Sequence, residues 1–358
     1  GSRCEVSDKF CDKVAKLGVI DAACDLTAVK TKKAAIKTDG SKQKSVRGIA
    51  KLIDANNAGT SKSSDCTIIL CEGDSAKAGI VSGLSKEDRN NIGVYPLKGK
   101  LLNVRGEAFN KISENKEIIE IKKILGLETD KEYKTLQDLH DNLRYGKILF
   151  MTDQDLDGSH IKGLGINLFH NLWESLMQLN VIGFMNTPIL KAKKNKQELV
   201  FYNDGEYNQW KQENNNASGW TVKYYKGLGT STSKEFKEYF QEKKIVTFQN
   251  SETTDNIIDL VFNKKRADDR KVWLGHYDRE LYLDTNKQQV SFDDFINQEF
   301  IHFSKYDCDR SIPNLRDGLK TSQRKILYAA FKKNLTKEIK VAQFSGYVSE
   351  NAAYHHGE

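Results

Sequence analysis

Long apolar runs are missing from this chain. None of its 358 residues lies in a stretch that approaches the roughly 18 consecutive apolar residues of a membrane-spanning helix. Proline is scarce, with three in the whole sequence, and the first residues show no secretory signal. We therefore expect a protein that has no membrane segment and is not secreted.

Cysteine pairs at metal-binding spacing are also missing. The six cysteines include no C-x-x-C pair, so the sequence gives no indication of a zinc site. Cys66 and Cys71 flank a short apolar run, where a reduced thiol behaves as a small apolar side chain. A reducing compartment inside the cell is the simpler interpretation.

Charge is only mildly unbalanced. The chain has 56 basic and 49 acidic side chains, which gives a net charge of +7. This excess permits a polyanionic partner without demanding one. The length suggests two or three domains with a substantial core.

The most informative stretch lies between positions 147 and 164. Its apolar run Ile148–Met151 predicts a short strand that is buried on both faces. Asp153, Asp155 and Asp157 follow at alternate positions, and Gly158 comes next. Carboxylates so close together repel one another unless a cation lies among them. The stretch therefore indicates a Mg²⁺ site.

Two other interpretations of this stretch deserve comparison. Asp-x-Asp-x-Asp-Gly also opens an EF-hand calcium loop, but the required glutamate is replaced by Leu164, and a strand precedes the motif instead of a helix. A helix N-cap, with further acids complementing the helix dipole, explains one aspartate well and three poorly.

A second acidic motif lies upstream. The apolar run at 66–70 leads into Glu72, Gly73 and Asp74, and a helix is expected over 75–84. Sites in open α/β sheets form beyond the carboxyl ends of the strands. We therefore predict that Glu72 and the three aspartates meet at one edge of a parallel sheet.

Several ordered motifs resemble the TOPRIM region of type IIA DNA topoisomerases, especially the single-chain enzymes of eukaryotes and large DNA viruses. They are Glu-Gly-Asp-Ser-Ala at 72–76, Pro-Leu-Lys-Gly-Lys-Leu-Leu-Asn-Val at 96–104, Asp-Gln-Asp-Leu-Asp-Gly-Ser-His-Ile at 153–161 and Lys-Tyr-Tyr-Lys-Gly-Leu-Gly-Thr-Ser-Thr-Ser at 223–233. The resemblance continues from 309–325 to Tyr-His-His-Gly-Glu at 354–358. This part of the chain resembles the start of the winged-helix domain.

The resemblance implies an α/β fold, with a Rossmann-like parallel-sheet TOPRIM domain followed by a mostly helical winged-helix (helix-turn-helix) segment. In that segment, a helix over 322–333 would bury a stripe formed by Ile326, Leu327, Ala330 and Phe331. The expected division is a connector from an upstream transducer/ATPase region at 1–64, the TOPRIM metal-binding domain at 65–185, a TOPRIM extension and linker at 186–300, and a truncated winged-helix domain at 301–358.

Two parts of this division have a plainer interpretation. Residues 39–47 are polar and basic, which is also typical of a solvated connector. Residues 246–300 are charged and mostly polar, so we expect solvated helices or a linker there.

The implied function is the DNA breakage–reunion core of an ATP-dependent type II topoisomerase, which performs Mg²⁺-dependent double-strand transesterification and strand passage. One or two Mg²⁺ ions are expected, with Mn²⁺ or Ca²⁺ as substitutes, and ATP would bind outside this chain. The expected partners are double-stranded DNA and, in the full-length enzyme, a second copy. The expected location is the nucleus or another DNA-containing cytoplasmic site.

The resemblance also implies roles for individual residues. Glu72, Asp153, Asp155 and Asp157 would hold the metal, and Glu72 would also act as general acid and base. The side chains expected to stabilise charge developing on the phosphate are Arg324, His355 and His356. Those expected to contact DNA are Lys98, Lys100, Asn103, Lys226, Arg310, Lys320, Arg324 and Lys325.

The nucleophilic tyrosine of the family is not found. In the family it follows an arginine further along the winged helix, and this chain stops at Glu358. Arg144-Tyr145 has the dipeptide but leads into the TOPRIM strand, and Tyr347 and Tyr354 stand in other contexts. We expect a fragment of a larger enzyme that does not form a tyrosyl–DNA intermediate alone.

Two other functions stay open. A TOPRIM nuclease or primase-like enzyme uses similar acids without a tyrosine, although the motifs at 309–358 argue against it. A non-catalytic DNA-binding scaffold would need no metal, although the intact acid set argues against that.

Overall fold

Within residues 6–225 and 227–354, which the computed structural model describes, the central sheet has six strands. The first four in the sheet are mutually parallel, and the fifth is antiparallel to its inner neighbour. The predicted parallel-sheet α/β fold is therefore confirmed. In sheet order the strands are β2 (Ile92–Leu97), β1 (Thr67–Glu72), β3 (Lys147–Met151), β4 (Ile182–Met185), β8 (Ile245–Gln249) and β9 (Gln289–Ser291).

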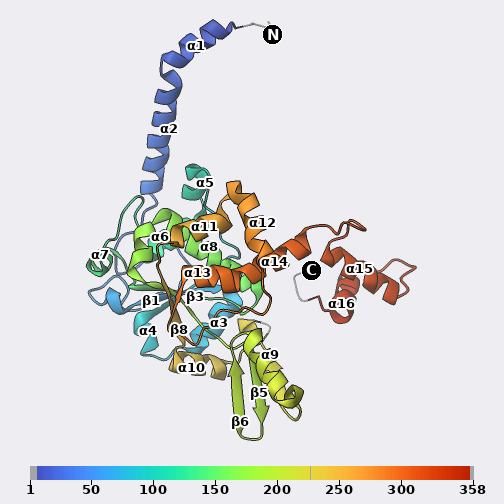
Figure 1. The fold of residues 1–358 in the computed structure, drawn as a ribbon. Helices are drawn as coiled ribbons and strands as arrows, with labels where there is room; N and C mark the ends of the chain where they lie inside the picture. Colours follow the sequence, from blue (N-terminus) through green and yellow to red (C-terminus); the bar gives the residue numbers. More distant parts are fainter. Residues whose placement is uncertain (1–5, 226, 355–358) are drawn as a thin grey trace.

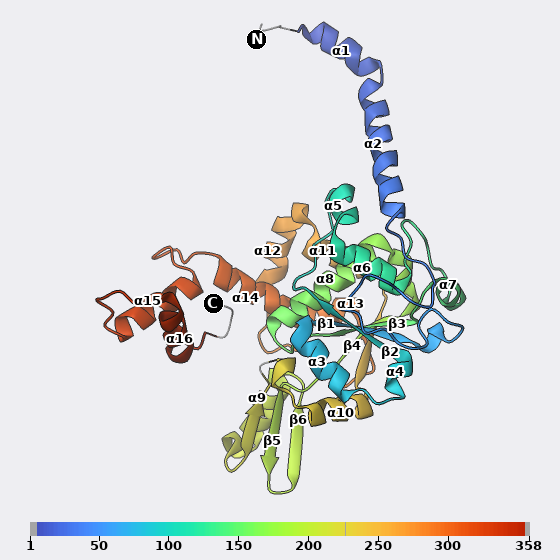
Figure 2. The ribbon, with the colours of Figure 1, turned by 180° about the vertical axis from the view of Figure 1, so that it is seen from behind.

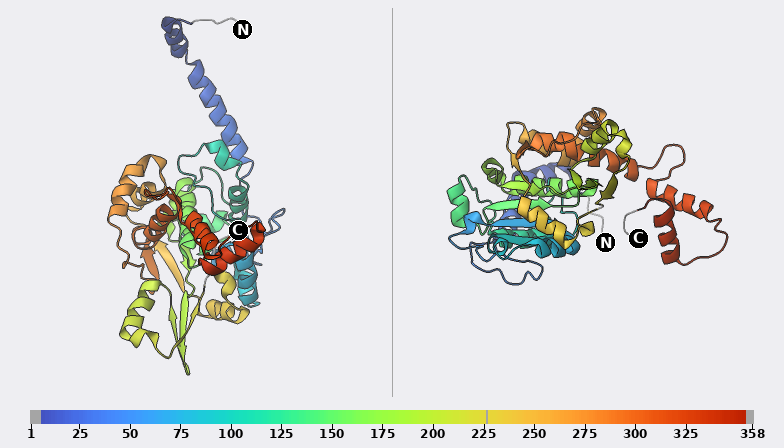
Figure 3. Two further views of the ribbon diagram at one scale, coloured as in Figure 1. Left: turned by 90° about the vertical axis from the view of Figure 1, so that its right-hand side faces the viewer. Right: turned by 90° about the horizontal axis from the view of Figure 1, so that it is seen from below.

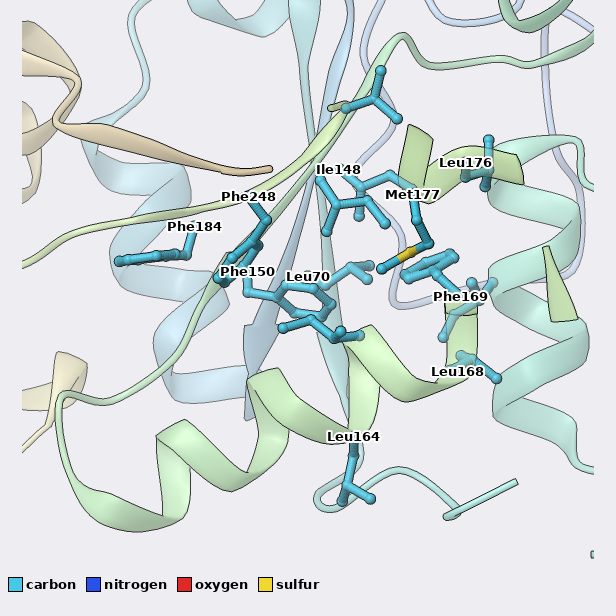
Figure 4. Packing of buried hydrophobic residues seen from close by; sticks show 14 of the residues in the cluster. Leu70, Ile148, Phe150, Leu164, Leu168, Phe169, Leu176, Met177, Phe184 and Phe248 are labelled. Atoms are coloured by element: carbon cyan, nitrogen blue, oxygen red, sulfur yellow. The ribbon is translucent and has the colours of Figure 1, made fainter. Parts of the chain in front are cut away.

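Helices cover both faces of this sheet (Figures 1 and 2). Alternate residues of β3 point to opposite faces: Ile148 and Phe150 join the larger core, and Leu149 and Met151 join the smaller one. Figure 4 shows the larger core, in which Leu164 and Leu168 are buried. The larger core includes α6 (Lys116–Leu125) and α8 (Leu156–Leu172), and the smaller includes α3 (Gly73–Gly83) and α10 (Ser233–Glu242).

A second, three-stranded antiparallel sheet extends away from the body (Figure 1). Its own small core contains Leu190, Phe201 and Tyr207. The elements of this unit are β5 (Leu190–Lys194), β6 (Gln197–Phe201), α9 (Asp204–Glu213) and β7 (Thr221–Tyr224).

The prediction of solvated helices or a linker over 246–300 fits α12 (Ala267–Gly275), which buries no residue, but is wrong for the segments that form strands. Strands β8 and β9 belong to the central sheet, and the Phe248 and Phe292 rings stack in the core with centroids 5.1 Å apart. The composition averaged over 246–300 is charged and mostly polar, and this average conceals the burial of the two rings. The helices here are α11 (Thr254–Phe262), α12 (Ala267–Gly275), α13 (Phe292–Phe295), a π-helix (Ile296–Phe300) and α14 (Ile301–Ser311).

The N-terminal helices α1 (Asp8–Lys16) and α2 (Val19–Ile36) project from the body (Figure 1). The chain after them packs on the sheet domain. A Cβ atom on Gly40 would lie 2.1 Å from the backbone oxygen of Lys122, and Ile53 pairs with Val94 in a β-bridge. The interpretation of this region as a solvated connector is therefore wrong for Gly40.

The C-terminal helices α15 (Thr321–Lys332) and α16 (Val341–Asn351) lie beside the body, beyond α14 (Figure 3). The predicted helix over 322–333 is confirmed, but its predicted buried stripe is wrong. Phe331 is 77% exposed, and Ile326 and Leu327 are also exposed. Among the described elements α15 contacts α14 and α16, and Ala329 is the α15 residue that these contacts bury.

The start of α6 shows how a single side chain can fix a helix boundary. A new helix begins at Lys116 because Asn115 caps α6, accepting hydrogen bonds from the Glu117 and Ile118 nitrogens. Nowhere in the described ranges does a helix combine the length and apolar character that crossing a membrane requires. The short helices are α4 (Asp88–Asn91), α5 (Phe109–Ser113) and α7 (Leu136–Asn142).

Candidate metal and DNA site

Glu72 and Asp153 meet at the carboxyl ends of two neighbouring parallel strands. Cys71 of β1 is in register with Met151 of β3, so the residues that follow emerge side by side. The Glu72 Oε2 atom accepts a hydrogen bond from the Asp153 backbone nitrogen at 3.3 Å. The prediction that the two acidic motifs share one sheet edge is therefore confirmed.

The acids at this edge affect one another. Burial raises the pKa of Glu72 to about 7, and the charges of Asp153, Asp155 and Asp157 contribute to the rise. Burial and the charge of Asp155 also raise the pKa of Asp153. Such crowding opposes ionisation, and a divalent cation would relieve it.

Asp153 is held by the loop that precedes α10. Its Oδ1 atom accepts a hydrogen bond from the Leu228 nitrogen at 2.7 Å. A Cβ atom on Gly227 would lie 2.3 Å from Asp153 Oδ2, so this close approach requires glycine. The loop thus fixes the Asp153 carboxylate at the sheet edge.

Asp155 caps helix α8. Its Oδ1 atom accepts a hydrogen bond from the Gly158 nitrogen at 2.7 Å, and the helix begins at Leu156. A Cβ atom on Gly158 would lie 1.9 Å from the Asp153 carbonyl oxygen. The N-cap interpretation therefore explains the position of Asp155, one of the three aspartates.

Asp157 lies against basic residues from two other segments. Arg310 donates Nη2 to Asp157 Oδ1 at 2.8 Å and Nη1 to Oδ2 at 2.9 Å. Lys100 Nζ is also 2.8 Å from Oδ1. These cations hold the pKa of Asp157 well below its usual range. Arg310 and Lys100 therefore compensate the negative charge of Asp157.

The oxygen donors at the edge fit Mg²⁺ in chemical type. No group of three or more His, Cys, Asp or Glu side chains is arranged to hold an ion in the part of the chain that the structure describes. Mg²⁺ does not need such a cage, because it is usually bound through one or two carboxylates together with water and substrate phosphates. Glu72 and its neighbouring aspartates can supply those carboxylates.

Two other residues predicted to contact DNA are near this edge but differ in accessibility. Lys98 is 3.6 Å from Glu120 and largely open to solvent. Asn103 turns inward, donating to the Phe262 carbonyl at 2.9 Å and accepting from Asn167 at 3.0 Å. Asn103 therefore orders the loop after β2 through contacts within the protein.

The remaining predicted site residues are elsewhere. Arg324 pairs with Asp317 at 2.7 Å, and Lys325 donates to the Ala353 carbonyl at 2.9 Å. Within the described ranges, no hydrogen bond or ion pair joins Arg324 or Lys325 to Glu72. Lys320 is the N-cap residue of α15. Outside the described residues lie Lys226, His355 and His356.

Three protein families match consecutive parts of the chain. Residues 67–182 match the Toprim domain, and residues 185–308 match the C-terminal associated domain of TOPRIM. Residues 310–358 match the family of the DNA gyrase and topoisomerase IV A subunits.

The chain belongs to the type IIA DNA topoisomerases.

Similar type II enzymes come from distant eukaryotes. DNA topoisomerase 2 of Plasmodium falciparum is 47% identical over 367 residues, covering 99% of this chain and 26% of the relative. DNA topoisomerase 2 of Drosophila melanogaster is 47% identical over 373 residues, covering 100% of this chain and 26% of the relative. The chain thus spans about a quarter of the length of the curated relatives it matches.

A solved type II topoisomerase structure has the same fold. It is the crystal structure of the Plasmodium falciparum topoisomerase II DNA-binding, cleavage and re-ligation domain, with 48% sequence identity and a TM-score of 0.78. The match covers 88% of this chain and 43% of that one. The resemblance to the eukaryotic enzymes is therefore confirmed.

The Arg-Tyr dipeptide that resembles the nucleophile motif of type IIA topoisomerases is part of the core. Arg144 is 0% exposed and Tyr145 is 1% exposed. The Arg144 guanidinium donates to the Gln43 carbonyl at 2.7 Å, and the Tyr145 hydroxyl donates to Asp54. A phenol buried in this way cannot attack a phosphodiester.

The residues that sequence reasoning missed form a polar network under the loop after β2. Arg105 donates to Asn167 at 3.1 Å and to Asp259 at 3.0 Å, and its Nη2 is 2.7 Å from His170 Nδ1. His170 Nε2 is in turn 2.7 Å from Asp255. Arg105 directly follows the motif at 96–104, and this position is the sequence signal that could have indicated its importance.

Proposed function

We propose that this chain supplies the metal-binding and DNA-contacting part of the breakage–reunion core of an ATP-dependent type II DNA topoisomerase. The reaction is Mg²⁺-dependent transesterification of both DNA strands, followed by strand passage and resealing. The observation that carries this proposal is the meeting of Glu72 and Asp153 at the carboxyl ends of β1 and β3. ATP would be hydrolysed outside this chain.

In this proposal Glu72, Asp153, Asp155 and Asp157 are the side chains that hold one or two Mg²⁺ ions, for which Mn²⁺ or Ca²⁺ can substitute. The bound metal supplies charge stabilisation at the leaving 3′-oxygen. Oxygen ligands alone suit a hard cation, which favours Mg²⁺ over zinc.

Glu72 is suited to proton transfer at the same 3′-oxygen. Its pKa of about 7 lets the carboxyl group exist in both protonation states near neutral pH. In the proposed reaction it gives a proton to the leaving oxygen during cleavage and takes it back during resealing. Burial and the neighbouring aspartates raise that pKa in the metal-free chain.

The basic residues would bind and orient the DNA backbone. Lys100 and Arg310 lie beside the acids, where a phosphate could accept hydrogen bonds from both. Arg324 offers a planar guanidinium from α15, suited to charge developing on a phosphate. The side chains that complete the proposed surface are Lys98, Asn103, Lys226, Lys320, Lys325, His355 and His356.

The proposed partners are double-stranded DNA and a second copy of the enzyme. Such a protein works wherever its DNA is kept, in the nucleus or another DNA-containing site. We propose no tyrosine of this chain as nucleophile. The nuclease and scaffold functions remain as alternatives that the following experiment separates.

The experiment incubates the chain with supercoiled plasmid and Mg²⁺, stops the reaction with detergent, and analyses nicks, linear DNA and protein-linked ends. The matched variants are Asp155→Asn, which keeps an N-cap residue, and Asp268→Asn, an exposed control on α12. We expect that no protein-linked ends form. We also expect that the chain binds Mg²⁺ and that, of the two variants, Asp155→Asn alone abolishes this binding.

Other results would favour other functions. Cleavage with free ends would indicate a TOPRIM nuclease. Protein-linked ends would mean that a tyrosine of this chain is the nucleophile. DNA binding with no metal binding that depends on Asp155 would indicate a scaffold.

A further inference from the structure

Asp157, one of the four proposed metal ligands, is paired with Arg310 and Lys100, two of the residues proposed to contact DNA. Arg310 forms two parallel hydrogen bonds with the Asp157 carboxylate, and Lys100 adds an ion pair. Charge-assisted pairs with this forked geometry are among the stronger polar contacts in proteins. The Asp157 and Arg310 side chains are 20% and 23% exposed, so solvent screens them less than an open surface pair.

The surroundings of Arg310 favour a defined position. Its Nε donates to Asp307 at 3.0 Å, and its guanidinium lies 4.8 Å from the Tyr306 ring centroid. Lys100 Nζ lies 5.4 Å from the centroid of Phe303, a ring on the same helix. Both cations are therefore supported by α14 while they contact Asp157 in the first turn of α8.

These contacts link two parts of the molecule. Asp157 belongs to the sheet edge that carries Glu72, and Arg310 is at the end of α14, from which the chain continues to α15 and α16 (Figure 3). An event that removes Arg310 from Asp157 would therefore affect both the acid cluster and the end of α14.

We propose that the Asp157–Arg310–Lys100 cluster is a DNA-sensitive latch that couples metal binding to DNA binding. A DNA phosphate is an alternative acceptor for Arg310 and Lys100. When the phosphate takes their hydrogen bonds, the ionised Asp157 carboxylate loses the positive charges that compensate it beside Glu72 and Asp155, and the affinity of the edge for a divalent cation rises. This inference rests on the proposed function.

Thermodynamic linkage makes the coupling reciprocal. If DNA strengthens metal binding by some factor, the metal strengthens DNA binding by the same factor. A merely structural ion pair would behave differently: breaking it would destabilise the fold and leave metal affinity unchanged. The two roles can therefore be separated by measuring metal binding directly.

The test measures Mn²⁺ binding to the 358-residue chain by the loss of the free-ion electron paramagnetic resonance signal, with and without a short DNA duplex. Without DNA, Arg310→Gln should bind Mn²⁺ about fivefold more tightly than the unchanged chain, within the usual range of coupling. Saturating duplex should tighten Mn²⁺ binding to the unchanged chain by a similar factor, and to Arg310→Gln by less.

Three further variants test whether the effect of Arg310 acts through Asp157. Arg279→Gln removes an exposed arginine elsewhere and should leave Mn²⁺ affinity unchanged. In an Asp157→Asn background, Arg310→Gln should lose its effect, because the acid it would release is absent. Arg310→Lys keeps the charge without the forked geometry and should give an intermediate affinity.

The outcomes distinguish the latch from the proposed function. If Mn²⁺ binding depends on Asp155 but is no tighter in Arg310→Gln, the latch is overturned and the proposed function is not. An equal effect of Arg310→Gln with and without Asp157 would also overturn it, since the arginine would then act as a general positive charge. Mn²⁺ binding insensitive to Asp155→Asn would overturn both proposals.

Discussion

The Glu72 carboxylate and the Asp153 backbone nitrogen are joined by a 3.3 Å hydrogen bond that spans the ends of two parallel strands. This single contact favours the charged form of Glu72, yet burial and three neighbouring aspartates outweigh it and raise the pKa to about 7. The carboxylates at this edge therefore repel one another, and a bound cation would reduce that repulsion.

The first prediction concerns pH and stability. An unfolded glutamate has a pKa of about 4.3, so between this value and about 7 the folded chain binds more protons than the unfolded chain. The free energy of unfolding should therefore fall as pH rises through this window. Glu72→Gln should abolish this fall and be more stable than the unchanged chain at about pH 8, by about 1–2 kcal/mol after allowing for screening.

Urea unfolding without divalent metal, at about pH 5 and about pH 8, checks this prediction. Glu280→Gln, which changes an exposed glutamate, is the matched control and should follow the unchanged chain. Identical pH dependence in Glu72→Gln and the unchanged chain would contradict the raised pKa.

The second prediction concerns the loop over Asp153. In Gly227→Ala the added methyl group would lie 2.3 Å from Asp153 Oδ2, so the loop or the carboxylate must move and the hydrogen bond from Leu228 should be lost. We expect Mn²⁺ affinity to change by about tenfold, the equivalent of one such hydrogen bond to a charged group. Isothermal titration calorimetry measures the change.

Gly346→Ala is the control for this loop variant, because a Cβ atom there meets nothing within 4 Å. Its metal affinity should equal that of the unchanged chain. If Gly227→Ala also binds Mn²⁺ normally, the loop has no part in positioning Asp153.

The third prediction concerns the buried Arg-Tyr pair. Asp54→Ala would leave the Arg144 guanidinium, which is 0% exposed, without its carboxylate partner. We expect the free energy of unfolding to fall by about 3–5 kcal/mol. Tyr145→Phe removes a hydroxyl that also accepts from the Ala55 nitrogen at 3.0 Å, and should cost about 1–2 kcal/mol.

Chemical denaturation measures both changes, and DNA binding by fluorescence anisotropy supplies a second readout. Tyr145→Phe should bind DNA as the unchanged chain does, because the phenol faces the core. A variant that folds normally yet loses DNA binding would mean that Tyr145 is accessible to the nucleic acid.

The sequence was most informative where local pattern determines structure. Short apolar runs before Glu72 and Asp153 predicted two buried strands, and the rule for strand ends then predicted that the acids meet. Asp155 could be recognised as an N-cap because capping depends on residues a few positions away.

Contacts between distant positions could not be predicted in this way. The partner of Asp157 is Arg310, 153 positions along the chain, and nothing local to either residue indicates the pair. Phe248 and Phe292 are buried although the range 246–300 is charged and mostly polar overall, because tertiary packing decides their burial. Phe331 shows the reverse: helical periodicity predicted burial, but α14 and α16 leave it exposed.

The central claim is that the acids at the ends of β1 and β3 hold a divalent cation. Anomalous X-ray diffraction from crystals of the chain soaked in Mn²⁺ tests it most directly. The account predicts an anomalous peak within coordination distance of carboxylate oxygens of Glu72 and of at least one of Asp153 and Asp155, which Asp155→Asn weakens or removes. Well-ordered carboxylates with no peak beside them, or a peak bound only elsewhere on the chain, would contradict the account.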